Sequence, residues 1–306
     1  MGKIAFMFPG QGAQYVGMGK DFYETIPVSR QMYELASKAS GLEVEALCFN
    51  ENEQIHITEY TQIAMLATEV AMLKAVEEKG LKPDVTAGLS LGEYGALVAS
   101  GVMGPEDVFR VVRMRGIYMQ EAVPHGGAMV AVLGLDTAVI EKICEETPGM
   151  VSVANYNCPG QIVITGEEDA INSAVEKLTE AGAKRCVTLK VSGPFHSPLL
   201  AGAGKKLAKE LEQVTIGEIQ VPYIANVTAD YVTDKETVKG LLEKQVSSSV
   251  RWQQTIERMI ADGVDTFVEI GPGKTLSGFM RKINREMKVY NVEKIEDLTK
   301  LEELIG

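Results

Sequence analysis

The 306-residue sequence is poor in cysteine, and its cysteines are not spaced for metal binding. Cys48, Cys144, Cys158 and Cys186 lie far apart, and no C-x-x-C pair occurs. Zinc sites and disulfide-stapled secreted domains both depend on paired cysteines. We therefore expect free thiols, no metal site and a cytoplasmic location, where thiols stay reduced.

The chain also has few basic residues relative to acidic ones, and it has no long apolar run. The 30 Lys and Arg residues stand against 42 Asp and Glu, for a formal net charge of −12. Such a surface repels nucleic acid and anionic lipid. The first apolar run, Ile4–Phe8, is too short for a signal peptide, and no run is long enough to span a bilayer. We expect a monomer that binds neither nucleic acid nor membrane.

The order of apolar stretches predicts a large α/β unit. A strand over Ile4–Phe8 leads into the glycine loop Pro9–Gly12, and helices follow. Apolar residues at helical spacing predict a long helix over Thr61–Lys79, closed by Gly80. The last third of the chain has the same character, with predicted elements over 223–227 (strand), 250–261 (helix) and 266–270 (strand).

Between residues 126 and 192 the pattern changes to β-α-β-β-α-β, which is the ferredoxin-like order. The six predicted elements cover 128–133, 136–146, 151–156, 161–165, 167–181 and 184–191. We predict a small domain at 126–192, inserted into a large α/β domain made of 1–125 and 193–306. Since 45% of the residues are hydrophobic, the chain can supply a core for both domains.

One Gly-x-Ser-x-Gly pentapeptide, residues 88–92, lies between an extended stretch over 83–87 and a helical stretch over 93–100. A serine on such a strand-to-helix turn projects its hydroxyl outward above a helix N-terminus. The glycines allow the close backbone approach that the turn requires. This context favours Ser90 as a nucleophile over a glycine-rich turn with an incidental serine.

A serine nucleophile needs a base, and the chain has only three histidines. His56 precedes the long helix and His125 precedes the small domain. His196 lies where the small domain returns to the large one, in a loop stiffened by Pro194 and Pro198. We choose His196, although an exposed loop histidine is the alternative. No Asp or Glu stands nearby to orient it, which favours a dyad with a backbone carbonyl as the orienting acceptor.

Arg115 lies on an apolar helix face, apart from Arg110 and Arg113. That face also carries Val108, Val111, Val112, Tyr118 and Met119. An arginine on an apolar face needs a partner, because an isolated buried charge is very costly. The partner is more commonly a structural Asp or Glu, but the guanidinium fork also suits a substrate carboxylate. Periodicity alone favours the structural alternative.

The stretch Gly271–Thr275 has the ending of a phosphate-binding loop. The first glycine of such a loop would fall at Val268, so the pattern is incomplete. We therefore do not predict a nucleotide site there.

Five motifs, in order over essentially the whole chain, resemble the malonyl-CoA:acyl carrier protein transacylase family. They are Phe8–Gln14, Gly88–Tyr94, Met114–Gly116, Pro194–His196 and Glu269–Lys274. The resemblance implies an α/β-hydrolase-like large domain with a ferredoxin-like insert, and an active site between the two. It also implies that Ser90 is the nucleophile, that His196 is the base and that Arg115 holds the malonyl carboxylate, which reverses the preference from periodicity.

The resemblance implies roles for five further residues. The backbone N–H groups of Gln11 and Leu91 would form the oxyanion hole. Gln245 would support the active-site histidine, and Asn226 and Gln62 match polar residues near the site. Two positions bear on variation in the family: Leu89 stands where many members have histidine, and Phe195 matches the malonyl-type signature of polyketide acyltransferases. We expect Leu89 to change packing behind the serine and not the chemistry.

The implied activity is transfer of a malonyl group from malonyl-CoA to the phosphopantetheine thiol of acyl carrier protein, in bacterial fatty acid synthesis. We expect a ping-pong reaction through malonyl-Ser90, without metal or redox cofactor. Because acyl carrier proteins are acidic, docking needs a basic patch. Lys205, Lys206 and Lys209 form one candidate, with an ordinary solvated face as the alternative.

Three other functions compete with this one. A free-standing acyltransferase serving a polyketide synthase would share the chemistry and differ in its carrier. A serine thioesterase would use the same turn but clear the acyl-serine with water. A non-catalytic carrier-docking subunit would have no reason to keep Ser90, His196, Arg115 and Gln11 together.

Overall fold

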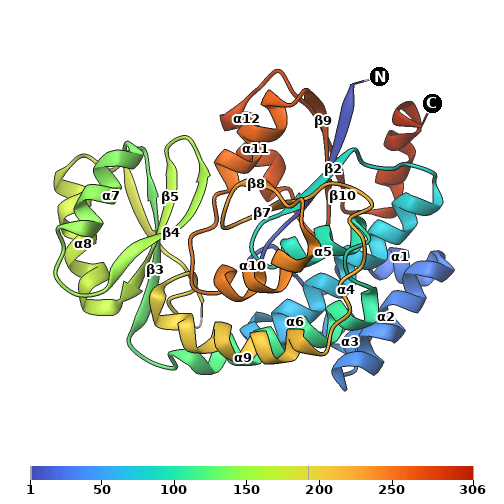
Figure 1. Ribbon diagram of the computed structural model, residues 1–306, viewed down its shortest axis with the longest axis horizontal. Coiled ribbons are helices and arrows are strands. Elements are labelled where there is room, and N and C mark those ends of the chain that lie inside the picture. Colours follow the sequence, from blue (N-terminus) through green and yellow to red (C-terminus); the bar gives the residue numbers. More distant parts are fainter. Residues whose placement is uncertain (1, 192, 306) are drawn as a thin grey trace.

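The computed structural model describes residues 2–191 and 193–305, which form two main sheets, each covered by its own helices (Figure 1). This is the predicted class, an α/β-hydrolase-like large domain with a ferredoxin-like insert, and the fold class is confirmed. The domain bounds at 1–125, 126–192 and 193–306 stay predictions. They are drawn at Met1, Ser192 and Gly306, which lie outside the described residues.

The large sheet contains four parallel strands in the order β10-β9-β1-β2. These are β1 (Lys3–Phe8), β2 (Val85–Gly88), β9 (Val264–Ile270) and β10 (Lys288–Val292). The central strands β1 and β9 are paired on both edges, and nearly all of their residues are buried, so both of their faces are covered as well. Parallel sheets are buried in this way when helices lie on each face.

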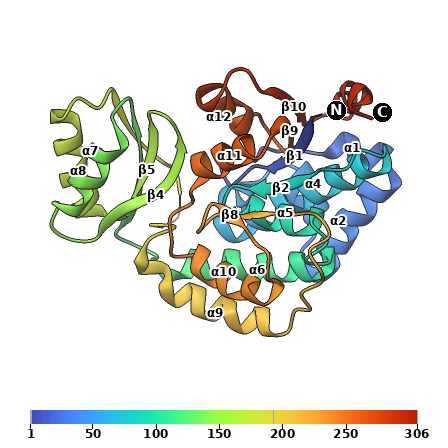
Figure 2. The same ribbon diagram turned by 45° about the horizontal axis from the view of Figure 1, so that its top comes forward.

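Helices cover both faces of the large sheet, as Figures 1 and 2 show. The α-helices of this part are α1 (Lys20–Thr25), α2 (Pro27–Ser40), α3 (Val44–Phe49), α4 (Thr58–Glu78), α5 (Gly92–Ala99), α6 (Pro105–Ala122), α9 (Ala201–Glu212), α10 (Val238–Gln245), α11 (Trp252–Ala261) and α12 (Thr275–Ile283). Short 3₁₀ segments cover Gln54–His56, Pro198–Leu200, Lys235–Thr237 and Ile295–Leu304.

The period of two along β1 divides the core into two clusters. Ile4, Phe6 and Phe8 pack on the side of α4, whereas Ala5 and Met7 pack on the side of α11 and α12. The helix predicted over 61–79 is α4, which begins three residues earlier and is buried on nearly every face. It is therefore a central core helix and has no wide solvent-exposed face.

The small domain has the predicted β-α-β-β-α-β order. Its elements are β3 (Gly127–Leu133), α7 (Thr137–Glu145), β4 (Val151–Cys158), β5 (Gln161–Glu167), α8 (Glu168–Glu180) and β6 (Arg185–Thr188). The sheet is antiparallel, in the order β4-β5-β3-β6, and α7 and α8 cover its outer face (Figure 2). Its inner face, including Met129 and Val163, joins the core of the large domain.

Three predicted elements are shorter than expected, each for a local reason. The strand predicted over 184–191 ends at Thr188, after which the Leu189 N–H makes one more bond to β3, at the Met129 carbonyl, and Leu189 and Val191 line a cavity. The strand predicted over 223–227 shrinks to β7 (Ile224–Ala225), paired with β8 (Asp230–Tyr231). The helix predicted from Val250 begins at Trp252.

Val250 instead joins the large domain to the small sheet. Its N–H donates to the Ala154 carbonyl at 2.8 Å, and its carbonyl accepts from the Tyr156 N–H at 2.9 Å. The Ser249 hydroxyl adds a bond of 2.6 Å to the Val153 carbonyl. The segment 248–251 thus extends the edge of β4 like a short additional strand.

In the described part of the chain, no helix is long and apolar enough to cross a membrane.

The burial of α4 sets a stability expectation. Leu66 is fully buried at the middle of α4, so Leu66→Ala should lower the free energy of unfolding by about 2–5 kcal/mol. Glu78→Ala, at the exposed end of the same helix, should change it by less than about 0.5 kcal/mol. Urea unfolding followed by circular dichroism measures both, and equal effects would contradict the central position of the helix.

Candidate active site

A cavity of about 220 Å³ lies between the carboxyl ends of the large-sheet strands and the inner face of the small sheet. Six of the eight predicted site residues line it, namely Gln11, Gln62, Ser90, Leu91, Arg115 and His196. The other two, Asn226 and Gln245, lie behind it and hydrogen-bond to residues that line it. All eight are therefore brought together. His56 and His125 are exposed and do not line the cavity.

Ser90 lies on the sharp turn between β2 and α5, with a positive φ of 55°. Few residues other than glycine adopt this left-handed conformation, and its strain is typical of functional turns. A Cβ on Gly88 would come within 1.9 Å of the Gly92 backbone, and one on Gly92 within 2.1 Å of the Phe8 carbonyl oxygen. Glycine at both positions is thus a steric requirement of the turn.

Asn226 holds the turn in place. Its Oδ1 accepts from the Ser90 N–H at 2.6 Å, and its Nδ2 donates to the Gly88 carbonyl at 2.6 Å. These two bonds explain why β7 ends at Ala225, since Asn226 must leave the hairpin to reach the turn.

His196 is in hydrogen-bond contact with Ser90, since its Nε2 lies 2.7 Å from the Ser90 Oγ. Its Nδ1 faces two backbone carbonyls, those of Gln245 at 2.9 Å and Ser248 at 3.1 Å. Carbonyls only accept, so Nδ1 carries the hydrogen and Nε2 is the free acceptor. Orientation by backbone carbonyls, without an acidic residue, is the arrangement predicted from the sequence.

Burial and the nearby charge of Arg115 lower the pKa of His196 to about 4, and the two carbonyls oppose this shift only in part. The imidazole is consequently neutral at physiological pH. A neutral imidazole with a free Nε2 is the form that can accept a proton from a serine hydroxyl.

Arg115 is almost completely buried, with 1% of its surface exposed. Its Nη1 donates to Gln62 Oε1 at 2.7 Å, and its Nη2 donates to Gln245 Oε1 at 3.0 Å and to Ser90 Oγ at 3.2 Å. No carboxylate in residues 2–191 and 193–305 lies within ion-pair distance of it. The prediction of an Asp or Glu partner, which periodicity favoured, is thus wrong, because the side-chain carbonyls of two glutamines take its place.

Glu93 is a site residue that the sequence analysis missed. It lies in the first turn of α5, is 1% exposed, and its Oε2 accepts from Gln245 Nε2 at 2.7 Å and from the Asn226 N–H at 3.2 Å. Gln245 Nε2 also donates to the Ser90 carbonyl at 2.9 Å. The signal available was its position three residues after Ser90, on the same side of a fully buried helix.

Two backbone N–H groups are available beside Ser90. Leu91 precedes α5 in helical conformation, and Gln11 lies in the loop after β1. Among the described residues, neither N–H donates a hydrogen bond. The Gln11 side chain is turned away to Thr58 Oγ1 at 3.1 Å. Both groups line the cavity and can therefore bind an oxygen there.

Leu89 and Phe195, the two positions that bear on variation in the family, both line the cavity. Leu89 also packs against the core cluster that contains α11 and α12, which agrees with the expected effect on packing. Phe195, 5% exposed, lies beside His196 on the opposite wall.

The loop that ends like a phosphate-binding loop is occupied by a carboxylate. Glu269 accepts from the N–H groups of Leu276 at 2.9 Å and Ser277 at 2.8 Å, and also from the Ser277 hydroxyl. The N-terminus of α12 is thus already satisfied by an internal anion.

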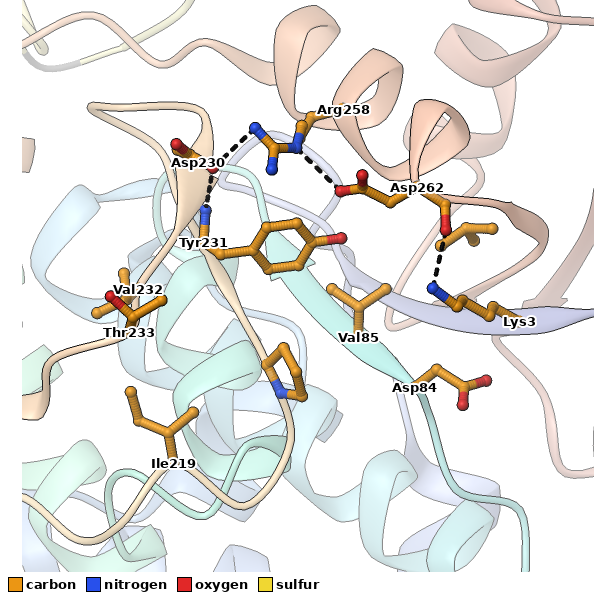
Figure 3. Close-up of a pocket in the computed structure, with 12 residues that line it drawn as sticks. Lys3, Asp84, Val85, Ile219, Asp230, Tyr231, Val232, Thr233, Arg258 and Asp262 are labelled. Carbon is orange, nitrogen blue, oxygen red and sulfur yellow. Dashed lines mark hydrogen bonds and ion pairs between the residues drawn. The ribbon is translucent and has the colours of Figure 1, made fainter.

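A larger cavity, of about 920 Å³, lies at the amino ends of the strands, away from Ser90 (Figure 3). Its charged groups are engaged with one another or with backbone. Arg258 pairs with Asp230 at 3.1 Å and with Asp262 at 2.9 Å, Lys3 donates to the Asp262 carbonyl, and Asp84 accepts from the Ile4 N–H. These charged groups are therefore less available to bind or activate a ligand than the polar groups of the smaller cavity.

The lysines considered for carrier docking lie on α9. Lys206 is 3.8 Å from Glu121 and lies over the Tyr118 ring, so its charge is partly balanced. Lys205 and Lys209 are on the same helix, near Glu210. The cluster is consequently less positive than its spacing suggests.

The chain was compared with known proteins. A family model described as acyl transferase domain matches residues 5–301. A malonyl CoA-acyl carrier protein transacylase of Bacillus subtilis is 45% identical, over 97% of this chain and 96% of its own. The crystal structure of an enzyme with the same description from Clostridium perfringens is 44% identical, with a TM-score of 0.95 over 99% of this chain and 97% of its own.

A further structural relative is a malonyl-transacylase solved in complex with its type II PKS acyl-carrier protein. It is 39% identical to this chain, with a TM-score of 0.95, and 99% of each chain is covered.

The geometry of the turn predicts opposite effects for two glycine substitutions. Gly92→Ala places a methyl group against the Phe8 carbonyl and should destabilise the protein and displace Ser90. Gly278→Ala, on the exposed face of α12 where nothing lies within 4 Å, should stabilise it by about 0.5–1 kcal/mol. Thermal unfolding of both variants tests this, and a Gly92→Ala protein as stable as wild type would contradict the steric requirement.

Proposed function

The chain belongs to the acyl transferase family, among relatives described as malonyl-CoA:acyl carrier protein transacylases, and on this premise we propose how it acts. It transfers a malonyl group from malonyl-CoA to the phosphopantetheine thiol of an acyl carrier protein, by a ping-pong reaction. The observation that carries the proposal is the position of Ser90 Oγ, 2.7 Å from His196 Nε2 and 3.2 Å from Arg115 Nη2. A nucleophile, its base and a cation for a carboxylate thus meet at one atom.

In the first half-reaction, His196 Nε2 takes the Ser90 proton while Oγ attacks the thioester carbonyl. The N–H groups of Gln11 and Leu91 stabilise the oxyanion of the tetrahedral intermediate. The C–S bond then breaks, His196 returns the proton to the CoA sulfur, and malonyl-Ser90 remains. The backbone carbonyls of Gln245 and Ser248 hold the imidazole through both proton transfers by accepting from Nδ1.

Arg115 selects the malonyl group by binding its free carboxylate. The guanidinium is held by the side-chain carbonyls of Gln62 and Gln245, which orient it without neutralising its charge. A buried cation without an ion pair gains strongly from an incoming anion. An acetyl group offers no such anion and should bind less well.

In the second half-reaction the phosphopantetheine thiol takes the place of CoA, and the same steps run in reverse. The enzyme must favour this thiol over water, which the small and largely apolar cavity serves by holding few waters. Neither a metal nor a redox cofactor is needed for these steps.

The carrier decides between the remaining alternatives. The relative solved with a type II PKS acyl-carrier protein supports a carrier protein as partner, and it keeps polyketide synthesis open beside fatty acid synthesis. A thioesterase is less well supported, because Arg115 has no role in hydrolysis of simple thioesters. We propose a monomer and retain the α9 lysines as one docking surface for the carrier.

The direct test is mass spectrometry of the intact protein after mixing with malonyl-CoA alone. We expect a malonyl adduct on the wild type, none on Ser90→Ala, and its discharge when carrier protein is added. An adduct that water clears without carrier would indicate a thioesterase. Absence of both adduct and CoA release would overturn the proposal.

Arg115→Ala tests the selectivity. Loss of a charge-assisted contact worth about 1.5–3 kcal/mol should lower kcat/KM for malonyl-CoA by about 10- to 150-fold, while activity on acetyl-CoA rises. Arg113→Ala is the matched control, because Arg113 lies on the same helix but pairs with Glu59 at 3.0 Å, outside the cavity. Equal losses on both substrates would make Arg115 a structural residue only.

A further inference from the structure

Glu93 and Arg115 are two buried groups of opposite charge, joined through one amide. Arg115 Nη2 donates to Gln245 Oε1 at 3.0 Å, and Gln245 Nε2 donates to Glu93 Oε2 at 2.7 Å. A carboxylate can only accept, so Glu93 fixes the amide with its NH₂ toward itself and its carbonyl toward Arg115. The orientation of Gln245 thus depends on both charges.

Arg115 is the cation that faces Glu93 among the described residues. The other titratable groups around Glu93 are Tyr94 on its own helix and Tyr223 before β7, and burial raises the pKa of both phenols, which stay neutral. His196 is neutral as well, because its pKa is lowered to about 4. In the unacylated site, Glu93 is therefore the group whose charge can balance Arg115.

A bound malonyl group disturbs this balance. Its carboxylate adds a second anion to a site with one cation, and burying an unbalanced charge is costly. We propose that Glu93 balances Arg115 in the unacylated enzyme and takes up a proton when the malonyl carboxylate binds the guanidinium. The inference rests on the malonyl transfer proposed above and makes Glu93 a positioning residue whose charge alternates during the cycle.

The protonation equilibrium of Glu93 suits this role. Burial raises its pKa to about 7, while the bonds from Gln245 and Asn226 and the charge of Arg115 oppose the rise. A second nearby anion raises a carboxyl pKa further, so the proton is taken up near neutral pH. With a pKa near 4, His196 lies much further from this range.

The transfer itself takes up no proton. The Ser90 proton passes through His196 to the CoA sulfur as the thioester C–S bond breaks and the serine ester C–O bond forms. A thiol has a pKa of about 8.5, so released CoA is largely protonated at pH 7. Any net proton uptake per CoA released therefore comes from groups of the protein.

Proton uptake can be measured by stopped flow in weakly buffered solution with a pH indicator, with CoA release followed in parallel. On the wild type, malonyl-CoA should cause uptake of a fraction of a proton per CoA released at pH 7, since burial raises the pKa of Glu93 to about 7 and the carboxyl is partly ionised there. The uptake should grow as the pH rises from 6 to 7.5. Acetyl-CoA binds less well and is used at a concentration high enough to release CoA; because it lacks the carboxylate, that release should cause no uptake.

Glu93→Gln keeps an acceptor for Gln245 and Asn226 but cannot be protonated, so the proton uptake per CoA released should be lost, whatever the rate of release. Glu69→Gln is the matched control. Glu69 is also fully buried, its carboxyl oxygens have no hydrogen-bond partner in the described part of the chain, and burial raises its pKa well above the ordinary value. Proton uptake per CoA released by the Glu69→Gln variant should equal that of the wild type.

The outcomes separate the two proposals. No CoA release from malonyl-CoA on the wild type would overturn the malonyl transfer itself. Normal release with no uptake on the wild type would overturn the role of Glu93 alone. Uptake that persists in Glu93→Gln, or that grows as the pH falls toward 5, would assign the proton to His196 and also overturn it. The comparison of malonyl-CoA with acetyl-CoA needs no variant and holds even where Glu93→Gln does not fold.

Discussion

A guanidinium buried without an ion-paired carboxylate is the constraint on which the rest of the site depends. Arg115 must be surrounded by acceptors, and these come from distant elements, with Gln62 from α4 and Gln245 from the end of α10. The helices α4, α6 and α10 therefore have to converge beside the β2–α5 turn. The same charge also lowers the pKa of His196 and so helps to keep the imidazole neutral. A single cation thus gathers the surrounding elements and shifts the proton equilibrium of its neighbour.

Ser90 and His196 are both held in strained conformations by this network. Ser90 and His196 both have positive φ, of 55° and 59°, which a free chain rarely adopts. The strain persists because the surrounding hydrogen bonds over-determine it. The Asn226 side chain bonds to the backbone on both sides of the turn, and the backbone carbonyl of Gln245 holds the imidazole. Gln245 and Asn226 in turn meet at one oxygen of Glu93.

Local signals in the sequence predicted much of this arrangement. The turn around Ser90 is encoded by five adjacent residues, and the missing acid near His196 correctly pointed to backbone orientation. The partners of Arg115 were not predictable, because Gln245 lies 130 residues away and no periodicity links the two. Glu93 was missed because an acid in the first turn of a helix is ordinary. Val250 was assigned to a helix because its pairing with β4 is a tertiary contact that local pattern cannot show.

The segment 248–251 has a consequence for how the molecule can move. On one side its backbone is paired with β4, and on the other the Ser248 carbonyl accepts from His196. The small domain is therefore fastened to His196 and cannot swing away from it while the imidazole keeps both carbonyl acceptors. A group larger than the cavity would have to find its room through rotation of side chains in the cavity wall, because swinging the domains apart would break the contact between Ser248 and His196.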